Sequence, residues 1–352
     1  MLNSKDLLAL AKATAKAEAN APVAYSYEGQ NFSYDQVNST LRAELNELVG
    51  TPESYRENKN LLFTIIEQTI GEVLPKKLEN RYADFAEVKT FGQGEKPLFL
   101  RRSSNDRIRA KQFISKVGLA GVYEVFKLGG IQSFEVPTSA VGGAAQIGIE
   151  EFLDGRVDFN ELIEIVLEGI EETIQKEAGK ALIAGINQLP SANFVEWTGF
   201  DEQEFDRLLT IADAYGTGKA TIYCDFMFAA KIMPNNVAYF SDNMKQKLWD
   251  DGYFAVYKGH NVIILPNSIE DATNTSLAAD PGYAWIVPAS AQKPVMISIE
   301  GATLTRETEN GDWSRDIMVY KKAGVAALFT NDICVYHDKS LKKELVAKVE
   351  GA

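Results

Sequence analysis

The sequence predicts an α+β protein built around one long amphipathic helix in the middle of the chain. From Asp158 to about Gln188, apolar residues recur at spacings of three and four, which is the period of one helix face. Shorter helical and strand-like runs lie on both sides of this helix, and they do not alternate in the regular strand–helix–strand order of a parallel sheet. Mixed sheets packed against helices are therefore expected.

Both ends of the long helix are marked. Asp158 is placed to cap its start, Glu161 completes a capping box, and Pro190 follows its end. At about 1.5 Å per residue the helix is on the order of 45 Å long, whereas a compact chain of this length has a diameter of roughly 50 Å. Such a helix suits a flat, elongated subunit better than a globule folded around a pocket, and it favours assembly over catalysis.

Residues 1–86 are predicted to form a polar, helical arm. Helices are expected over Ser4–Ala19 and Asn60–Leu74, the second of which would end at Pro75. The segment offers little apolar surface for a core of its own, so we expect it to extend from the body of the protein.

Residues 87–135 are predicted to form an extended, basic hairpin with its tip near Ser103–Asp106. Alternating runs at Pro97–Leu100 and Val122–Phe126 lie between glycines. Eight basic and two acidic residues between Lys96 and Lys127 give this segment a charge of +6. Because the whole chain has a net charge of −13, the rest of the chain has a charge of −19. The total argues against a general nucleic-acid binder, and the asymmetry fits docking on an acidic neighbouring copy. A solvated loop and a local nucleic-acid contact remain alternatives.

The rest of the chain alternates helices and strands. Helices are expected over Phe205–Ala214 and Ser241–Asp250, with a helical turn before Pro234. The expected strands are Ala220–Phe226, a hairpin over Tyr253–Leu265 that turns at Lys258–Asn261, and two final strands, Arg315–Lys322 and Val325–Tyr336, separated by Gly324.

The cysteines and the apolar runs indicate the compartment. Cys224 and Cys334 lie in strand-like runs and are expected to be buried free thiols, which implies reducing surroundings. The sequence has no signal-peptide pattern after Met1, and its apolar runs are too short to cross a bilayer. We expect a soluble protein, made in the cytoplasm, with no membrane partner.

Three glycine-containing motifs fail as ligand sites. Gly155 and Glu161 occupy the sixth and twelfth positions of a calcium loop, but Phe152 at the third position offers no oxygen. The Gly216–Lys219 segment lacks a phosphate loop's first glycine and its magnesium-binding hydroxyl, and it runs from helix to strand. Val141–Gly148 lacks dinucleotide spacing and is expected to be an extended leg.

The residues most often used in catalysis form no recognisable set. His260 lies in a predicted hairpin turn and His337 just after the last predicted strand, where exposed histidines are common. The neighbouring acids Asp250 and Asp251 would point in different directions from a helix. We therefore predict no catalytic, cofactor-binding or metal site, no cofactor, and no enzymatic activity.

The order of elements resembles the major capsid proteins of tailed bacteriophages, whose fold is shared with encapsulins. Gln132–Thr138 would return the hairpin to the long helix, and Trp313–Tyr320 with Ile333–Tyr336 resemble the closing strands of that fold. The resemblance implies an N-terminal arm over 1–86, an extension loop over 87–135, a peripheral domain over 136–215 and 304–352 with its spine helix at 158–188, and an axial domain over 216–303.

The resemblance also implies a function. The chain would be a structural subunit that self-assembles into pentamers and hexamers of an icosahedral shell enclosing double-stranded DNA, located in the virion and assembled in the host cytoplasm. Partners would be other copies of the chain, with a scaffolding protein, a portal and decoration proteins as further candidates. Packaged DNA would be touched only by weak or non-specific contacts.

Other functions stay open at the level of sequence. An encapsulin-like compartment shell shares the same fold. A cytoplasmic enzyme could be built around His260, Asp225 or Lys219, although no other group converges on them. A calcium- or nucleotide-binding module is the remaining alternative.

Overall fold

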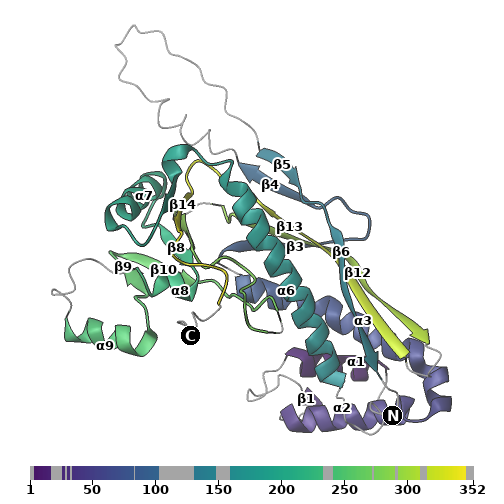
Figure 1. The fold of residues 1–352 in the computed structure, drawn as a ribbon. Helices are drawn as coiled ribbons and strands as arrows, with labels where there is room; N and C mark the ends of the chain where they lie inside the picture. The colour runs from purple at the N-terminus through teal and green to yellow at the C-terminus, as the bar shows by residue number, and fades with distance from the viewer. Residues whose placement is uncertain are drawn as a thin grey trace, which may run out of the picture. The chain divides into compact units, whose positions relative to one another are not determined.

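The structure is a computed structural model. It describes residues 4–16, 26–27, 30–31, 34–82, 84–102, 131–147, 159–232, 241–271, 273–289, 292–309 and 315–345. The chain divides into two compact units (Figure 1), the first formed by residues 1–97, 136–174 and 297–324 and the second by 98–135, 175–296 and 325–352. Three elements, α6, β12 and β13, contribute residues to both units.

The first unit begins with three helices, α1 (Ser4–Lys16), α2 (Tyr34–Val49) and α3 (Pro52–Tyr82), and a short strand pair, β1 (Ser26–Tyr27) with β2 (Gln30–Asn31). The helices bury a row of apolar side chains, including Leu7, Leu10, Leu41, Leu45, Ile65, Ile66 and Leu74. The expectation that this region has too little apolar surface for a core is therefore wrong. Its apolar residues are spread over three helices, so each helix looks polar when read alone.

Helix α3 continues through Pro75, where the sequence predicted its end. A proline inside a helix removes one backbone hydrogen bond and costs about 3 kcal/mol. Val73, Leu74 and Leu78 on either side of it are buried. Burying each such side chain contributes about 1.5–3 kcal/mol, so packing offsets the cost of the proline.

A four-stranded sheet completes the first unit, in the order β3 (Ala86–Phe91), β12 (Val295–Glu309), β13 (Arg315–Ala327) and β6 (Ser139–Ile147). Helix α3 lies along β12, because the Glu67 carboxylate accepts a hydrogen bond from the Thr305 amide at 2.8 Å and the Tyr55 hydroxyl lies 3.1 Å from Glu307. The glycine-rich segment predicted as a leg is the edge strand β6, which pairs with β13 over nine residues.

Gly324 was predicted to separate two strands, but β13 runs through it. A Cβ atom at this position would lie 2.2 Å from the Pro137 carbonyl oxygen and 2.9 Å from the Ser298 hydroxyl. The glycine therefore permits a close approach of neighbouring backbone, and it does not break the strand. The last strand, β14 (Cys334–Asp338), is correspondingly shorter than predicted.

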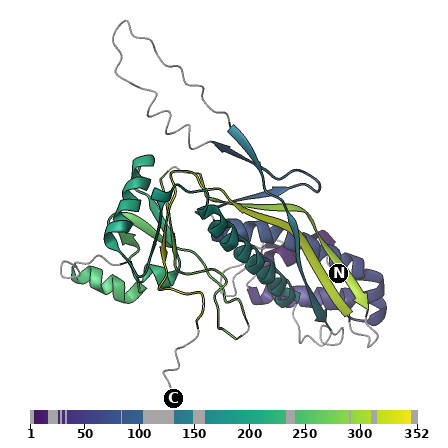
Figure 2. The same ribbon diagram turned by 45° about the horizontal axis from the view of Figure 1, so that its top comes forward.

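The second unit contains an antiparallel hairpin stem, which we define as β4 (Leu98–Arg102) and β5 (Ile131–Glu135). The two strands lie side by side in Figures 1 and 2, with Leu98 opposite Glu135 and Arg102 opposite Ile131. The predicted hairpin is confirmed at its base. Its predicted tip and the run Val122–Phe126 lie outside the described residues.

The main sheet of the second unit has six strands of mixed direction, as predicted. Their order is β7 (Phe194–Trp197), β14, β11 (Tyr283–Val287), β8 (Thr221–Cys224), β10 (His260–Ile264) and β9 (Val256–Tyr257). Strands β7 and β14 are parallel, as are β8 and β10, and the other neighbours are antiparallel.

Helix α7 (Glu202–Tyr215) covers one face of this sheet. Phe205 is fully buried and contacts the rings of Tyr257 and Tyr336 at centroid distances of 5.6 and 5.5 Å. Cys224 and Cys334 lie in the same core as free, buried thiols, as predicted. The core is therefore an aromatic and aliphatic layer between one helix and the sheet.

The remaining predicted elements are present within two or three residues. The long helix is α6 (Phe159–Ile186), preceded by a predicted cap at Asp158 that lies outside the described residues. Short helices η1 (Ser191–Asn193) and α8 (Phe226–Ala229) and helix α9 (Asp242–Asp251) follow. The β9–β10 turn is only Lys258-Gly259, both with positive φ, so His260 is already a strand residue.

Candidate assembly surfaces

The hairpin stem has one buried and one exposed face. Phe99 and Arg101 are buried, and the Arg101 Nε lies 3.3 Å from the Met296 sulfur. Leu98 and Leu100 alternate with them and are 40% and 62% exposed. Because successive side chains in a strand point to opposite faces, the two leucines form an apolar strip on the outer face of the stem.

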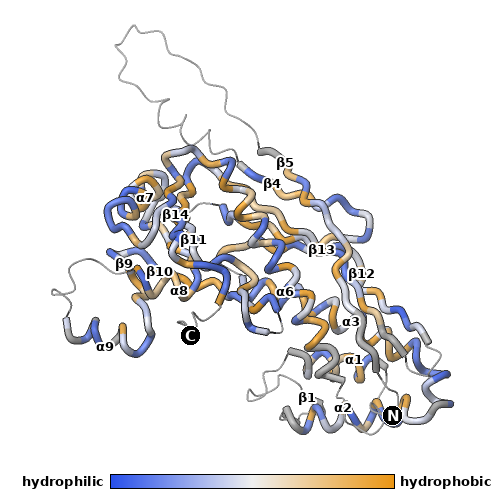
Figure 3. The backbone as a smooth tube through the Cα atoms, in the orientation of Figure 1, coloured by the Kyte–Doolittle hydropathy of each residue, from blue (hydrophilic) through white to orange (hydrophobic). Residues whose placement is uncertain are grey.

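Exposed aromatic side chains lie on α8 and α9, namely Phe226 and Trp249, and together with the partly buried Tyr253 we call them the aromatic patch. Trp249, in the last turn of α9, is 87% exposed, and Phe226 is half exposed. The Phe226 and Tyr253 rings contact each other at a centroid distance of 6.2 Å. Figure 3 shows α9 as mainly hydrophilic, so the exposed tryptophan lies on an otherwise polar helix. Tryptophan is enriched among the residues that dominate protein interfaces.

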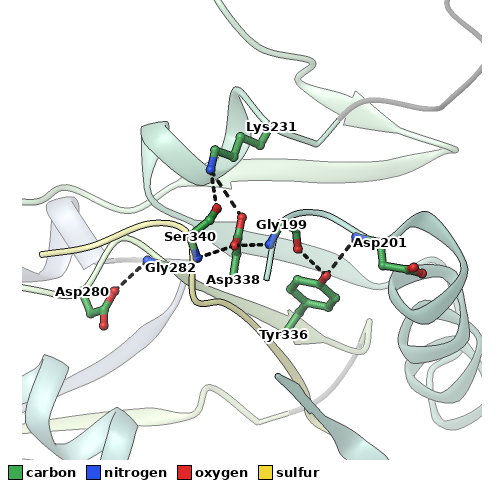
Figure 4. Close-up of polar contacts among 8 residues, drawn as sticks. All are labelled: Gly199, Asp201, Lys231, Asp280, Gly282, Tyr336, Asp338 and Ser340. Carbon is green, nitrogen blue, oxygen red and sulfur yellow. Dashed lines mark hydrogen bonds and ion pairs between the residues drawn. The ribbon is translucent and has the colours of Figure 1, made fainter. Parts of the chain in front are cut away.

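A buried polar network supports one end of the six-stranded sheet (Figure 4). The Asp338 carboxylate accepts hydrogen bonds from the backbone amides of Gly199 at 2.7 Å and Ser340 at 2.8 Å, and Lys231 Nζ lies 3.5 Å away. Burial alone would raise the pKa of Asp338, but the hydrogen bonds from Ser340 and Gly199 and the Lys231 charge hold it below its ordinary value. The carboxylate therefore stays ionised and fixes the β7–α7 loop to β14.

Tyr336, two residues before Asp338 on β14, continues this network. Its hydroxyl donates to the Gly199 carbonyl and accepts from the Asp201 amide, both at 2.9 Å. The Asp201 side chain in turn accepts from the Glu204 amide and caps α7. These contacts give Asp338, Tyr336 and Asp201 structural roles in joining the β7–α7 loop to β14 and to the start of α7.

His260 was predicted to face solvent, and this is wrong, because it is only 4% exposed. Its Nδ1 lies 3.1 Å from the Ala220 carbonyl oxygen and its Nε2 lies 3.6 Å from the Asp213 carboxylate. The same carboxylate accepts from the Ala220 amide at 2.8 Å and lies 3.4 Å from Lys219 Nζ. The Gly216–Lys219 segment is therefore a turn closed by Asp213.

His337 is also more enclosed than predicted. It lies within β14 and stacks on the Tyr283 ring at a centroid distance of 4.1 Å, with its Nδ1 3.1 Å from Glu196. Asp225 is the N-cap of α8, where it accepts from the Met227 amide at 2.8 Å. The partners of His337 lie far from it in the sequence, so no local pattern marked its position, whereas the contact of Asp225 is a local helix cap.

Of the other residues considered as ligands in the sequence, some lie in described segments and some do not. Most of the calcium-loop segment, Glu150–Asp158, lies outside the described residues. Asp250 and Asp251 end α9. Within the ranges that the structure describes, no group of three or more histidine, cysteine or acidic side chains is arranged to hold a metal ion. In the same ranges no helix combines the length and apolar character needed to span a membrane.

Comparison with protein families gives a match over almost the whole chain. A family model described as "SPbeta prophage-derived putative capsid protein YonB" matches residues 7–334. No curated protein matches the sequence.

Comparison with solved structures gives several distant matches. The chain is 12% identical to a virus-like particle from Pyrococcus furiosus, with a TM-score of 0.41 over 77% of this chain and 98% of that one. For the capsid of cyanophage P-SCSP1u the identity is 11% and the TM-score 0.46, over 73% and 86% of the two chains. For the SrpI encapsulin complex from Synechococcus elongatus PCC 7942 the values are 13% and 0.38, over 67% and 88%.

Proposed function

Because the chain belongs to the YonB family of phage capsid proteins, we propose that it builds a closed icosahedral shell by assembling into pentamers and hexamers. It is a subunit of a capsid, a structural component of the virion. The finer proposal is that this shell encloses double-stranded DNA and is assembled in the host cytoplasm. Family membership favours this function over an encapsulin-like compartment and over the enzyme alternative.

The observation that carries the proposal is the two-faced hairpin stem. Its inner face is held by the buried side chains of Phe99 and Arg101, while its outer face exposes Leu98 and Leu100. The basic run that begins at Lys96 lies in the same hairpin. Two exposed leucines, with a basic run in the same hairpin of the sequence, fit a heterologous contact with an acidic surface of another copy, the contact type that generates rings and shells.

A second contact between copies is a further element of the proposal. We assign the exposed aromatic patch to it, because Trp249 is 87% exposed and tryptophan is enriched among the residues that dominate protein interfaces. The domain boundaries, the partners other than the chain itself (scaffolding, portal and decoration proteins) and weak DNA contacts stay predictions. The local contacts of His260, Lys219 and Asp225 account for these residues without a catalytic role.

The test is assembly of variants at the outer face of the stem. Leu100→Asp, alone and combined with Leu98→Asp, should leave a folded subunit that no longer assembles, because it places charge in the contact. Leu100→Met keeps the apolar surface and is the matched control. Light scattering and negative-stain microscopy would report particle mass and shape. Normal particles from the double aspartate variant would refute the role of the stem.

A further inference from the structure

We propose that Glu300 is a positioning residue that clamps together the two roots of the hairpin. We define the roots as residues 92–97, just before β4, and residues 136–138, just after β5. The inference rests on the proposed role of the hairpin in assembly. It identifies the side chain that holds the base of the hairpin in place. All residues of the clamp lie within the first unit.

One carboxylate joins both roots to the long strand β12. Glu300 is 7% exposed, and its Oε1 accepts a hydrogen bond from the Gly94 amide at 3.0 Å. Its Oε2 accepts from the Thr138 hydroxyl. The Lys322 ammonium, on β13, lies 3.5 Å from Oε1. Gly94 and Thr138 are separated by the entire hairpin in sequence, so the carboxylate bridges the points where the chain enters and leaves it.

Neighbouring contacts hold the same two segments in place. The Val136 amide donates to the Pro97 carbonyl at 3.0 Å, which closes the base between the roots. The Ser298 hydroxyl lies 3.5 Å from the Val136 carbonyl oxygen and 3.2 Å from that of Gly324. Gly324 permits this close approach, as described above. The base is therefore built from β12 and β13, and the charged side chain of Glu300 contacts both roots.

The chemistry of the clamp favours an ionised carboxylate. The hydrogen bonds from Thr138 and Gly94, together with the charge of Lys322, hold the pKa of Glu300 below its ordinary value. A carboxylate accepts at both oxygens at once, and charge-assisted bonds of this kind are stronger than neutral ones. A shortened side chain, such as alanine, would release both roots, while leaving the apolar core of the unit unchanged.

The first experiment uses the unassembled full-length subunit, so it does not depend on capsid formation. Hydrogen exchange should be about tenfold faster or more in peptides covering 92–102 and 131–138 in Glu300→Ala than in wild type. Glu307→Ala is the matched control, because Glu307 lies on the same strand but contacts Tyr55 and Lys59 of α3. Unchanged exchange at both roots in Glu300→Ala would overturn the clamp.

The second experiment measures assembly of the same variants. Glu300→Ala should lower the yield of regular particles, with a melting temperature like that of Glu307→Ala. Glu300→Gln should restore assembly in large part, because its amide can still bond both Gly94 and Thr138. If Glu300→Ala fails to fold, Thr138→Val, which removes one bond, should give faster exchange than wild type at residues 131–138, and a wild-type rate there would overturn the clamp.

The two experiments separate the clamp from the proposed function. Faster exchange with normal assembly would overturn the positioning role, because loosened roots would then have no effect on the contact. Failure of the wild-type chain to assemble under any condition would count against the proposed function. The exchange result would still decide whether Glu300 holds the roots.

Discussion

The carboxylate of Glu171, on α6, lies between the side chains of Lys77 and Arg81 in the last turns of α3. Glu171 is 2% exposed, and its Oε2 lies 3.4 Å from Lys77 Nζ while its Oε1 pairs with Arg81. Both basic residues follow Pro75, so the contact depends on α3 continuing through that proline. The pairing attaches α3 to the part of α6 that belongs to the first unit.

Replacing Glu171 should therefore destabilise the first unit. Glu171→Ala is expected to lower the free energy of unfolding by about 1–3 kcal/mol, since it removes charge-assisted bonds while the two basic groups stay partly solvated. Chemical denaturation would measure the change. The control is Glu172→Ala, at the exposed residue that follows Glu171. Its free energy of unfolding should lie within about 0.5 kcal/mol of that of wild type. Equal stabilities of the two variants would show that the pairing contributes little.

The Asp338 network predicts a pH-dependent stability. Asp338→Asn should lower the free energy of unfolding at pH 7 by about 1–3 kcal/mol, because the buried carboxylate loses its charge and its pairing with Lys231. The folded-state pKa of Asp338 is lower than its unfolded value, which is near 3.9. Its contribution is therefore complete above about pH 5 and is lost as the pH falls through the folded-state pKa.

The measurement is a series of denaturation curves of wild type and Asp338→Asn between pH 7 and pH 3. The gap between the two proteins should close toward the acid end. Asp251→Asn, at an exposed helix end, should show no such gap at any pH. A constant gap for Asp338→Asn would mean that its carboxylate does not titrate as the network requires.

The sequence predicted well the features that depend on local pattern, and it missed those set by packing. The period of α6 and the place of the hairpin turn, which begins at Lys258, are local, and both were found. Pro75 and Gly324 are strong local signals for an end, yet α3 and β13 continue through them. In each case the neighbours decide the outcome: buried Val73, Leu74 and Leu78 beside the proline, and the close backbone of Pro137 beside the glycine.

The candidate surfaces were predictable only in part. The basic composition of the hairpin is visible in the sequence, but the choice of Leu98 and Leu100 as outer residues depends on which face of β4 meets the protein. The burial of His260 follows from a turn of two residues where four were predicted. No local sequence pattern pointed to Asp338, Glu171 or Glu300. Their partners Gly199, Arg81 and Gly94 are 139, 90 and 206 residues away in the sequence.

The two cysteines should be unreactive in the folded protein. Both are buried, and burial raises the pKa of the Cys334 thiol to about 12 and that of Cys224 above its ordinary value. Since the thiolate is the reactive form, a thiol-specific reagent at pH 8 should modify neither residue. In denaturant both should react at once. Rapid labelling of one cysteine in the native protein would place it outside the core.

Two tryptophans provide a contrast between surface and core. Trp285 is buried and stacks on Phe329 at a centroid distance of 5.4 Å, so Trp285→Ala should cost about 3–5 kcal/mol of stability. Trp249→Ala should leave thermal unfolding within about 2 °C of wild type, because Trp249 is exposed and contributes little to folding. It should nevertheless reduce particle yield. Unchanged yield would remove the aromatic patch from the proposed contacts.

Self-assembly is tested most directly by electron microscopy of the purified chain, with its mass measured by light scattering. We expect pentamers, hexamers and closed shells, with the stem residues Leu98 and Leu100 buried against another copy. A persistent monomer or small dimer, also when co-expressed with the capsid-assembly proteins of its own phage or prophage, would contradict this expectation.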